Sequence, residues 1–216
     1  MRDFPVFTTD NGVASIVLRE VPYKGEAYIT IRDSAQPKEF LEECLKFCKA
    51  VGAKRIYGSG HTVLEQYPLH TMIYKMQAPV ESLPQSDCAL FPVTEKTIDQ
   101  WREIYSEKMR NIPNAATITK EDAKELLRKG QGYFVHQGGK LLGIGMVEGD
   151  RICAIAAVEP GAGEQVMCAL CHGLVSELAQ LEVAAENTRA MRLYERLGFV
   201  KTAAVFRWYK IFEDVK

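Results

Sequence analysis

The sequence predicts an α/β protein of the α+β type, with a mixed sheet divided between a smaller N-terminal lobe and a larger C-terminal domain. Strand-like and helix-like patterns alternate in both halves of the 216-residue chain. Between the halves, Pro79 and Pro84 lie in a stretch with turn residues and little periodicity. We therefore expect an α/β lobe over residues 1–80, a linker over 81–89 and a second domain over 90–216.

Composition and charge favour a protein that binds a small ligand. The chain is 47% hydrophobic, and its 27 Lys and Arg residues nearly balance 28 Asp and Glu residues. No dense basic block is present, so neither nucleic acid nor an anionic membrane is an expected partner. The start lacks the basic and apolar regions of a secretory signal, and no run of 18 apolar residues occurs. We expect a soluble, cytoplasmic protein.

The N-terminal half shows the pattern of a compact α/β unit. Alternating apolar and polar residues predict two strands on either side of a turn at 23–26, and Pro37 begins a helix with apolar residues at a 3.6-residue period. Two more strands follow, with a short helical turn between them. The expected elements are strands at 13–21, 26–33, 53–60 and 70–78, a helix at 38–52 and a helical turn at 63–67.

The C-terminal half continues with a strand, two helices and a three-stranded meander. Thr119 and Asp122 form an N-cap signal for the second helix, which Gly130 ends. Gly138 and Gly139 mark a hairpin. Residues 152–158 are apolar nearly throughout, which predicts a central strand covered on both faces. The expected elements are strands at 90–94, 132–137, 141–149 and 151–160, and helices at 98–109 and 121–130.

The next stretch, PGAGEQVMCALCH at 160–172, combines two motifs with different chemistry. Its first half is a glycine turn that opens a helix, and its second half spells Cys-x-x-Cys-His, the haem-attachment pattern. On a helix Cys168 and Cys171 share an apolar stripe, and no export signal or second Cys/His pair accompanies them. Buried packing is therefore favoured, and we expect neither haem nor metal.

The final segment, from residue 179 on, carries the most specific motif. We expect a strand at 179–187, a helix at 188–198 and strands at 199–205 and 207–212. Asn187 either caps the helix or bonds a ligand at the strand's end, and the Tyr194 phenol either packs or protonates a leaving thiolate. The residues matching N-x-x-A-x-x-L-Y-x-x-x-G-F are Asn187, Ala190, Leu193, Tyr194, Gly198 and Phe199. This pattern resembles the GNAT superfamily of acyl-CoA-dependent N-acyltransferases.

The resemblance implies the fold and the chemistry of the region from residue 90 onward. It implies acetyl-CoA as acyl donor, a primary amine on a small molecule or peptide as acceptor, and Tyr194 as general acid. The strand at 151–160 would splay from its neighbour and bind the donor. The residues that match the family's donor-binding positions are Ala156, Ala157, Val158, Gly161, Gly163, Glu164, Asn187, Ala190 and Tyr194.

The phosphate-binding loop departs from the family's pattern. It is shorter, it lacks the usual Arg or Gln, and Glu164 in the first helical turn would repel a pyrophosphate beside it. An alternative function is therefore a catalytically inactive GNAT-like module that binds acyl-CoA or has a regulatory role. The general base is open among Glu148, Glu159 and His136.

Residues 13–76 also resemble part of a GNAT domain, without the phosphate-loop glycines or the Asn/Tyr motif. The chain is then either a tandem with one degenerate half or a GNAT domain preceded by an unrelated α/β lobe. The first alternative implies a pseudo-dimer of two lobes, and a homodimer is the other assembly that the family suggests.

Overall fold

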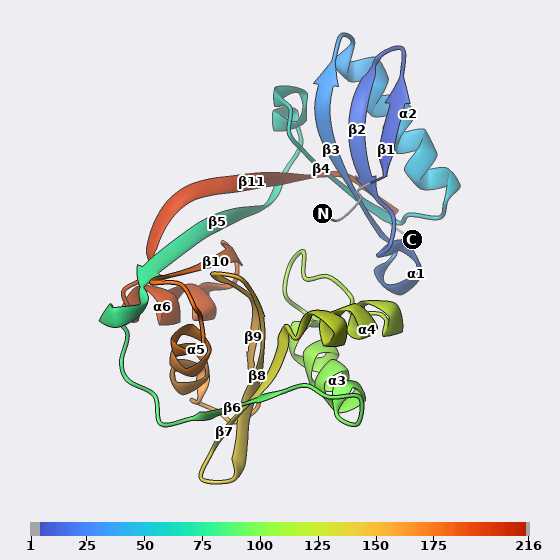
Figure 1. The fold of residues 1–216 in the computed structure, drawn as a ribbon. Coiled ribbons are helices and arrows are strands. Elements are labelled where there is room, and N and C mark those ends of the chain that lie inside the picture. The colour runs from blue at the N-terminus through green and yellow to red at the C-terminus, as the bar shows by residue number, and fades with distance from the viewer. Residues whose placement is uncertain (1–4, 215–216) are drawn as a thin grey trace. The chain divides into compact units, whose positions relative to one another are not determined.

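The computed structural model describes residues 5–214, which fold into two compact units (Figure 1). Of these residues, the first unit contains 5–72 together with 205–214, and the second contains Ile73–Ala204. The segment 81–89 lies inside the second unit. Among the described residues, none of the helices combines the length and apolar character needed to cross a membrane.

The first unit packs one long helix on a sheet in the order β1-β2-β3-β4-β11. Strands β2 and β3 are antiparallel, whereas β3 and β4 are parallel and joined through α2. The core combines Ile29 and Ile56 of the sheet with Phe40 of α2 and with Tyr209 and Ile211 from the end of β11. The elements are β1 (Val6–Thr9), β2 (Gly12–Val17), α1 (Val21–Lys24), β3 (Glu26–Ser34), α2 (Pro37–Ala50), β4 (Arg55–Ser59), η1 (Thr62–Gln66) and β11 (Val200–Glu213).

Three expectations for these elements were wrong. Strand β1 was missed. The strand expected at 13–21 ends at Val17, and α1 follows with Pro22 near its start. Proline has no N–H for a strand ladder but fits the first helical turn. The two strands expected at 199–205 and 207–212 form one strand, β11.

The second unit has a sheet in the order β5-β10-β9-β8-β7-β6, in which only β9 and β10 are parallel. Helices α5 and α6 pack on one face with Val135, and α3 and α4 pack on the other face with Phe134 (Figure 1). This mixed α/β architecture confirms the predicted fold class. The elements are β5 (Leu69–Pro79), η2 (Val80–Ser82), β6 (Ala89–Pro92), α3 (Ile98–Met109), α4 (Lys120–Lys129), β7 (Gly132–Gln137), β8 (Lys140–Glu148), β9 (Arg151–Ala157), α5 (Gly163–His172), β10 (Leu178–Ala184) and α6 (Thr188–Arg196).

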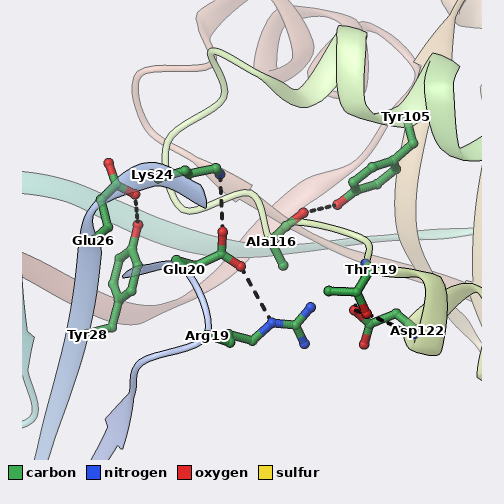
Figure 2. A network of polar contacts seen from close by, with 9 residues as sticks. All are labelled: Arg19, Glu20, Lys24, Glu26, Tyr28, Tyr105, Ala116, Thr119 and Asp122. Atoms are coloured by element: carbon green, nitrogen blue, oxygen red, sulfur yellow. Dashed lines mark hydrogen bonds and ion pairs between the residues drawn. The ribbon is translucent and has the colours of Figure 1, made fainter. Parts of the chain in front are cut away.

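Local polar contacts fix the start of α4 and the position of α3, as Figure 2 shows for Thr119 with Asp122 and for Tyr105 with Ala116. The Thr119 hydroxyl accepts a hydrogen bond from the Asp122 N–H at 3.1 Å, and the Asp122 carboxylate accepts one from the Thr119 N–H at 2.9 Å. This capping box confirms the predicted start of α4, and Gly130 at φ 62° confirms its end. The Tyr105 hydroxyl donates a hydrogen bond to the Ala116 carbonyl at 3.0 Å. This bond connects α3 to the loop before α4.

Two glycines of β8 allow α5 to lie close to the sheet. A Cβ at Gly143 would lie 2.5 Å from the Ala156 carbonyl oxygen and 2.8 Å from Cγ2 of Val166. A Cβ at Gly145 would overlap the side chain of Leu170, which is fully buried. The absence of side chains at both positions therefore sets how closely α5 approaches the central strands.

Candidate functional site

The two parallel strands of the second unit separate soon after they meet. Strands β9 and β10 pair only at Arg151 with Gln180 and at Ile152 with Leu181, whereas β10 and β5 pair over seven positions. Both strands continue beyond this point, β9 to Ala157 and β10 to Ala184. Residues 153–157 of β9 therefore have backbone groups on the β10 side without a strand partner in the described chain.

A β-bulge in β9 coincides with the point of separation. Met146 of β8 faces Ala154 and the next residue, Val147, faces Ile152, so Cys153 has no counterpart. An extra residue of this kind bends its strand and increases the local twist, which turns β9 away from β10. The expectation of a central strand covered on both faces is confirmed. Ile152 and Ile155 of β9 pack in the cluster that includes α5, and Ala154 and Ala156 pack in the cluster that includes α3. The buried residues of β9 are Ile152 and Ala156.

The turn after β9 leads directly into helix α5. The N–H groups of Val158 and Glu159 both donate to the Leu142 carbonyl, at 2.8 and 3.2 Å. Gly161 has φ 87°, and a Cβ there would meet nothing within 4 Å. Helix α5 starts at Gly163, which confirms that the glycine turn opens a helix, and no side chain caps its first turn. Its first three N–H groups therefore have no carbonyl of the helix to bind, and they carry the positive end of its dipole.

The carboxylates beside this turn are paired with cations. Glu164 in the first turn of α5 lies 3.8 Å from a guanidinium nitrogen of Arg196 in α6, and Glu159 lies 2.8 Å from Lys140 Nζ. All four side chains are at least a third exposed, so the pairs are screened by solvent. The negative charge of Glu164 is thus partly balanced by Arg196. This pair also brings a positively charged side chain next to a turn that contains no Lys or Arg.

Asn187 is the N-cap of α6. Its Oδ1 accepts a hydrogen bond from the Ala190 N–H at 3.3 Å, which confirms the capping interpretation. The cap uses the amide oxygen and not the amide NH₂ group. Ala190 itself is half-buried against the α5 cluster.

Tyr194 lies on the inner face of α6. Its side chain is 6% exposed and its ring lies 5.9 Å from that of Phe199. Burial raises the pKa of the phenol well above its ordinary value, and the nearby Cys171 thiol raises it further. The hydroxyl therefore keeps its proton at neutral pH and can act as a proton donor.

The three candidates for a general base occupy different surroundings. Gln131 donates a hydrogen bond to Glu148 and Arg151 is 3.0 Å away, and these contacts lower the pKa of that carboxyl, which makes it a weaker base. Glu159 pairs with Lys140. His136 on β7 lies 5.1 Å from the Phe91 ring and lines a cavity of about 360 Å³, while its Nδ1 atom is buried without a hydrogen-bond partner.

The two cysteines of the Cys-x-x-Cys-His stretch belong to the core. Cys168 and Cys171 lie on α5 and are 2% and 0% exposed, which confirms the predicted packing. Burial raises the pKa of Cys171 to about 12, so it is a neutral thiol at ordinary pH. His172 Nε2 lies 3.0 Å from the Pro84 carbonyl oxygen. Nowhere in residues 5–214 do three or more His, Cys, Asp or Glu side chains gather as a metal site would require.

The comparisons place the chain among GNAT folds. No family model matches the sequence, and no curated protein matches it in sequence. A Staphylococcus epidermidis protein of unknown function is 14% identical, with a TM-score of 0.63 over 99% of this chain and 95% of its own. A GNAT-family acetyltransferase from Colwellia psychrerythraea is 11% identical, with a TM-score of 0.52 and coverages of 95% and 84%. A tandem GNAT protein from the clavulanic acid biosynthesis pathway is 10% identical, with a TM-score of 0.52 and coverages of 93% and 78%. The fold is that of the GNAT acyltransferases.

Proposed function

We propose that this protein is an N-acetyltransferase that transfers an acetyl group from acetyl-CoA to a primary amine. The observation that carries the proposal is the separation of β9 from β10. Strand β9 then continues into the glycine turn, and no side chain caps the first turn of helix α5 that follows. An unpaired strand edge binds extended amide groups through its backbone. A helix start with free N–H groups binds phosphate. The pantetheine and pyrophosphate of coenzyme A present these two chemistries in the same order.

In this proposal the donor lies along the open edge of β9. Its amides bond backbone groups of residues 153–157, with Ala156 and Ala157 closest to the turn, while the Val158 N–H is bound to the Leu142 carbonyl. The phosphates meet the N–H groups of Gly163, Glu164 and Gln165, and Gly161 adds no side chain to obstruct them. Asn187 contributes its free amide NH₂ group and Ala190 an apolar surface beside the opening.

The chemical step is a direct attack of the amine nitrogen on the thioester carbonyl. A C–N bond forms, the C–S bond breaks, and the leaving thiolate takes a proton from the Tyr194 hydroxyl. The acceptor must arrive as a free amine, because an ammonium group has no lone pair for the attack. The low pKa of Glu148 argues against that carboxylate as the base. The attacking nitrogen loses one proton to water as the amide forms, and Tyr194 regains its proton from solvent after the product leaves.

The proposal is tested by calorimetry with acetyl-CoA and coenzyme A, followed by a thiol-release assay against a panel of primary amines. We expect binding of both nucleotides and turnover with at least one small-molecule or peptide amine. Failure to bind either nucleotide would refute the proposal.

A second candidate function is a GNAT-like module that binds acyl-CoA, or regulates a partner, without turnover. The observation in its favour is that Glu148 and Glu159 are both engaged in ion pairs, which leaves neither carboxylate free to act as the base. The turn also lacks the basic residue of other phosphate loops. Tight binding of acetyl-CoA without thiol release on any amine would favour this candidate.

We further propose that the protein is a cytoplasmic tandem with one donor site. The order β2-β3-α2-β4 in the first unit repeats the order β8-β9-α5-β10 in the second, each with one parallel strand pair. In the first unit, however, β3 and β4 stay paired over five positions, from Glu26 with Arg55 to Thr30 with Ser59. That ladder has no opening for a donor, which supports a degenerate first half.

A further inference from the structure

Helix α6 carries three arginines on one exposed face. Arg189, Arg192 and Arg196 are all exposed, and at 3.6 residues per turn their directions fall within about 60° of arc. Arg196 pairs with Glu164 across 3.8 Å. Within residues 5–214, Arg189 and Arg192 form no ion pair. We call these three residues the arginine row.

The arginine row runs beside the first turn of α5. A Cβ at Gly163 would lie 3.1 Å from Cδ2 of Leu193, so α5 begins against the middle of α6. Leu193 lies next to the row on the helix surface, about 40° from Arg189. Together with the Glu164–Arg196 pair, this contact places at least the C-terminal end of the row at the turn that precedes α5.

The turn needs a source of positive charge if it is to hold a phosphorylated donor. Residues 158–163 contain no Lys or Arg, and the charged residue among them is Glu159. Glu164 follows directly. Coenzyme A brings a pyrophosphate and a 3′-phosphate, whose charges the backbone N–H groups alone only partly balance.

We propose that the arginine row supplies the basic charge that the turn lacks and binds the phosphate groups of the donor. This inference rests on the proposed function. Guanidinium groups bind phosphate through two parallel hydrogen bonds, and they stay charged at all physiological pH values. Arg196 exchanges the Glu164 carboxylate for a phosphate when the donor binds. The row thereby selects a phosphorylated acyl carrier over a bare pantetheine thioester.

The test compares two triple variants of the full chain by calorimetry. Arg189→Gln, Arg192→Gln and Arg196→Gln together remove the row. Lys124→Gln, Arg128→Gln and Lys129→Gln together remove the same charge from exposed positions of α4. The probes are coenzyme A, dephospho-coenzyme A, which lacks the 3′-phosphate, and pantetheine, which lacks all phosphates.

We expect the row variant to bind coenzyme A at least about tenfold more weakly than the unchanged protein at low ionic strength. The affinity of the α4 control for coenzyme A should stay within about twofold of that of the unchanged protein. The difference in affinity between the row variant and the unchanged protein should become smaller at higher salt, because salt screens the charges. Pantetheine should bind all three proteins equally. If the row substitutions weaken binding of dephospho-coenzyme A less than binding of coenzyme A, part of the row binds the 3′-phosphate. If they weaken binding of both probes equally, the row binds the pyrophosphate.

Equal affinity of the row variant and the α4 control for coenzyme A would overturn this inference and leave the proposed function standing. A matching loss for pantetheine would also overturn it, because general damage to the site would then explain the result. If the unchanged protein binds no coenzyme A at any salt concentration, the proposed function itself fails.

The exchange of partners by Arg196 has its own test. Glu164→Gln should tighten coenzyme A binding about threefold, because it removes a negative charge and frees Arg196. In a protein that already carries Arg196→Gln, Glu164→Gln should increase the affinity for coenzyme A by less. An equal gain in both backgrounds would contradict the exchange.

Discussion

At the scale of single residues, the structure gives Asn187 and Tyr194 well-defined local roles. Asn187 could be predicted as a cap from the sequence alone, because a cap depends on residues three positions apart. The burial of Tyr194 could not, since it depends on Phe199 and on Cys171 from another helix. The Glu164–Arg196 pair was also missed, because no sequence spacing relates the two helices.

Replacing Tyr194 with Phe should lower kcat by about a hundredfold and leave the affinity for coenzyme A nearly unchanged. The ring still packs on Phe199, while the proton donor is lost. Because the pKa of the phenol is raised, it stays protonated from pH 6 to pH 9, so the shape of the pH profile should not change. Steady-state kinetics across that range check this, and an unchanged kcat would remove Tyr194 from the mechanism.

Asn187 offers a way to separate capping from ligand binding. Asn187→Asp keeps a capping oxygen and Asn187→Ala does not, so only the alanine variant should lose about 1 kcal/mol of unfolding free energy. Both variants lack the amide NH₂ group and should bind coenzyme A more weakly if that group contacts the donor. Urea unfolding and calorimetry measure the two effects. Unchanged binding by the aspartate variant would restrict Asn187 to its cap.

The six cysteines should divide into two classes by reactivity. Cys44, Cys48, Cys168 and Cys171 are buried, whereas Cys88 and Cys153 are partly exposed. Burial raises the pKa of Cys44, Cys48 and Cys171 from 9.0 to about 12, so they remain thiols at pH 8. A disulfide reagent should therefore titrate two thiols quickly in the folded protein and all six in urea.

The same raised pKa values set the direction of alkaline unfolding. A thiol that holds its proton more tightly in the folded state than in the unfolded state stabilises the fold below about pH 9. That contribution falls as the pH rises toward 12. Urea unfolding should therefore show a declining unfolding free energy above pH 9.

At the scale of elements, helix and strand patterns predicted most of the second unit, and local pairing signals such as Gly138–Gly139 were enough for its hairpin. The opening between β9 and β10 followed from the family resemblance and not from the residues, because the bulge at Cys153 is defined by the register with β8. Residues 152–158 alone resemble an ordinary buried strand.

The glycines of β8 provide a test of this packing. Gly143→Ala places a methyl group 2.5 Å from the Ala156 carbonyl oxygen, so β9 must shift. We expect a loss of about 1–3 kcal/mol of unfolding free energy, measured in urea, and weaker binding of coenzyme A because the open edge moves. Ala89→Ser, at an exposed position of β6, is the control. A Gly143 variant as stable as the control would show that β9 tolerates the shift.

At the scale of the whole molecule, strand β11 contributes residues to both units. It begins in the second unit and ends in the first, where Tyr209 and Ile211 complete the core. This arrangement could not be predicted from the sequence, since two separate strands at 199–205 and 207–212 fit the local pattern equally well.

Ile211→Ala should destabilise mainly the first unit, by about 2–4 kcal/mol for a large side chain removed from a core. Hydrogen exchange should show lower protection in β3 and β4 than in β8 and β9. Leu142→Ala in the second unit should show the opposite pattern. Equal loss of protection in both units after either change would show that the units unfold together.

The course of β11 also bears on how the protein is made. The ribosome releases residues 1–72 first, but their core lacks Tyr209 and Ile211 until the whole second unit has been synthesised. The core of the first unit therefore cannot be completed before the second unit has been synthesised. During translation, the apolar residues that pack against Tyr209 and Ile211 lack these two partners until the last strand has left the ribosome.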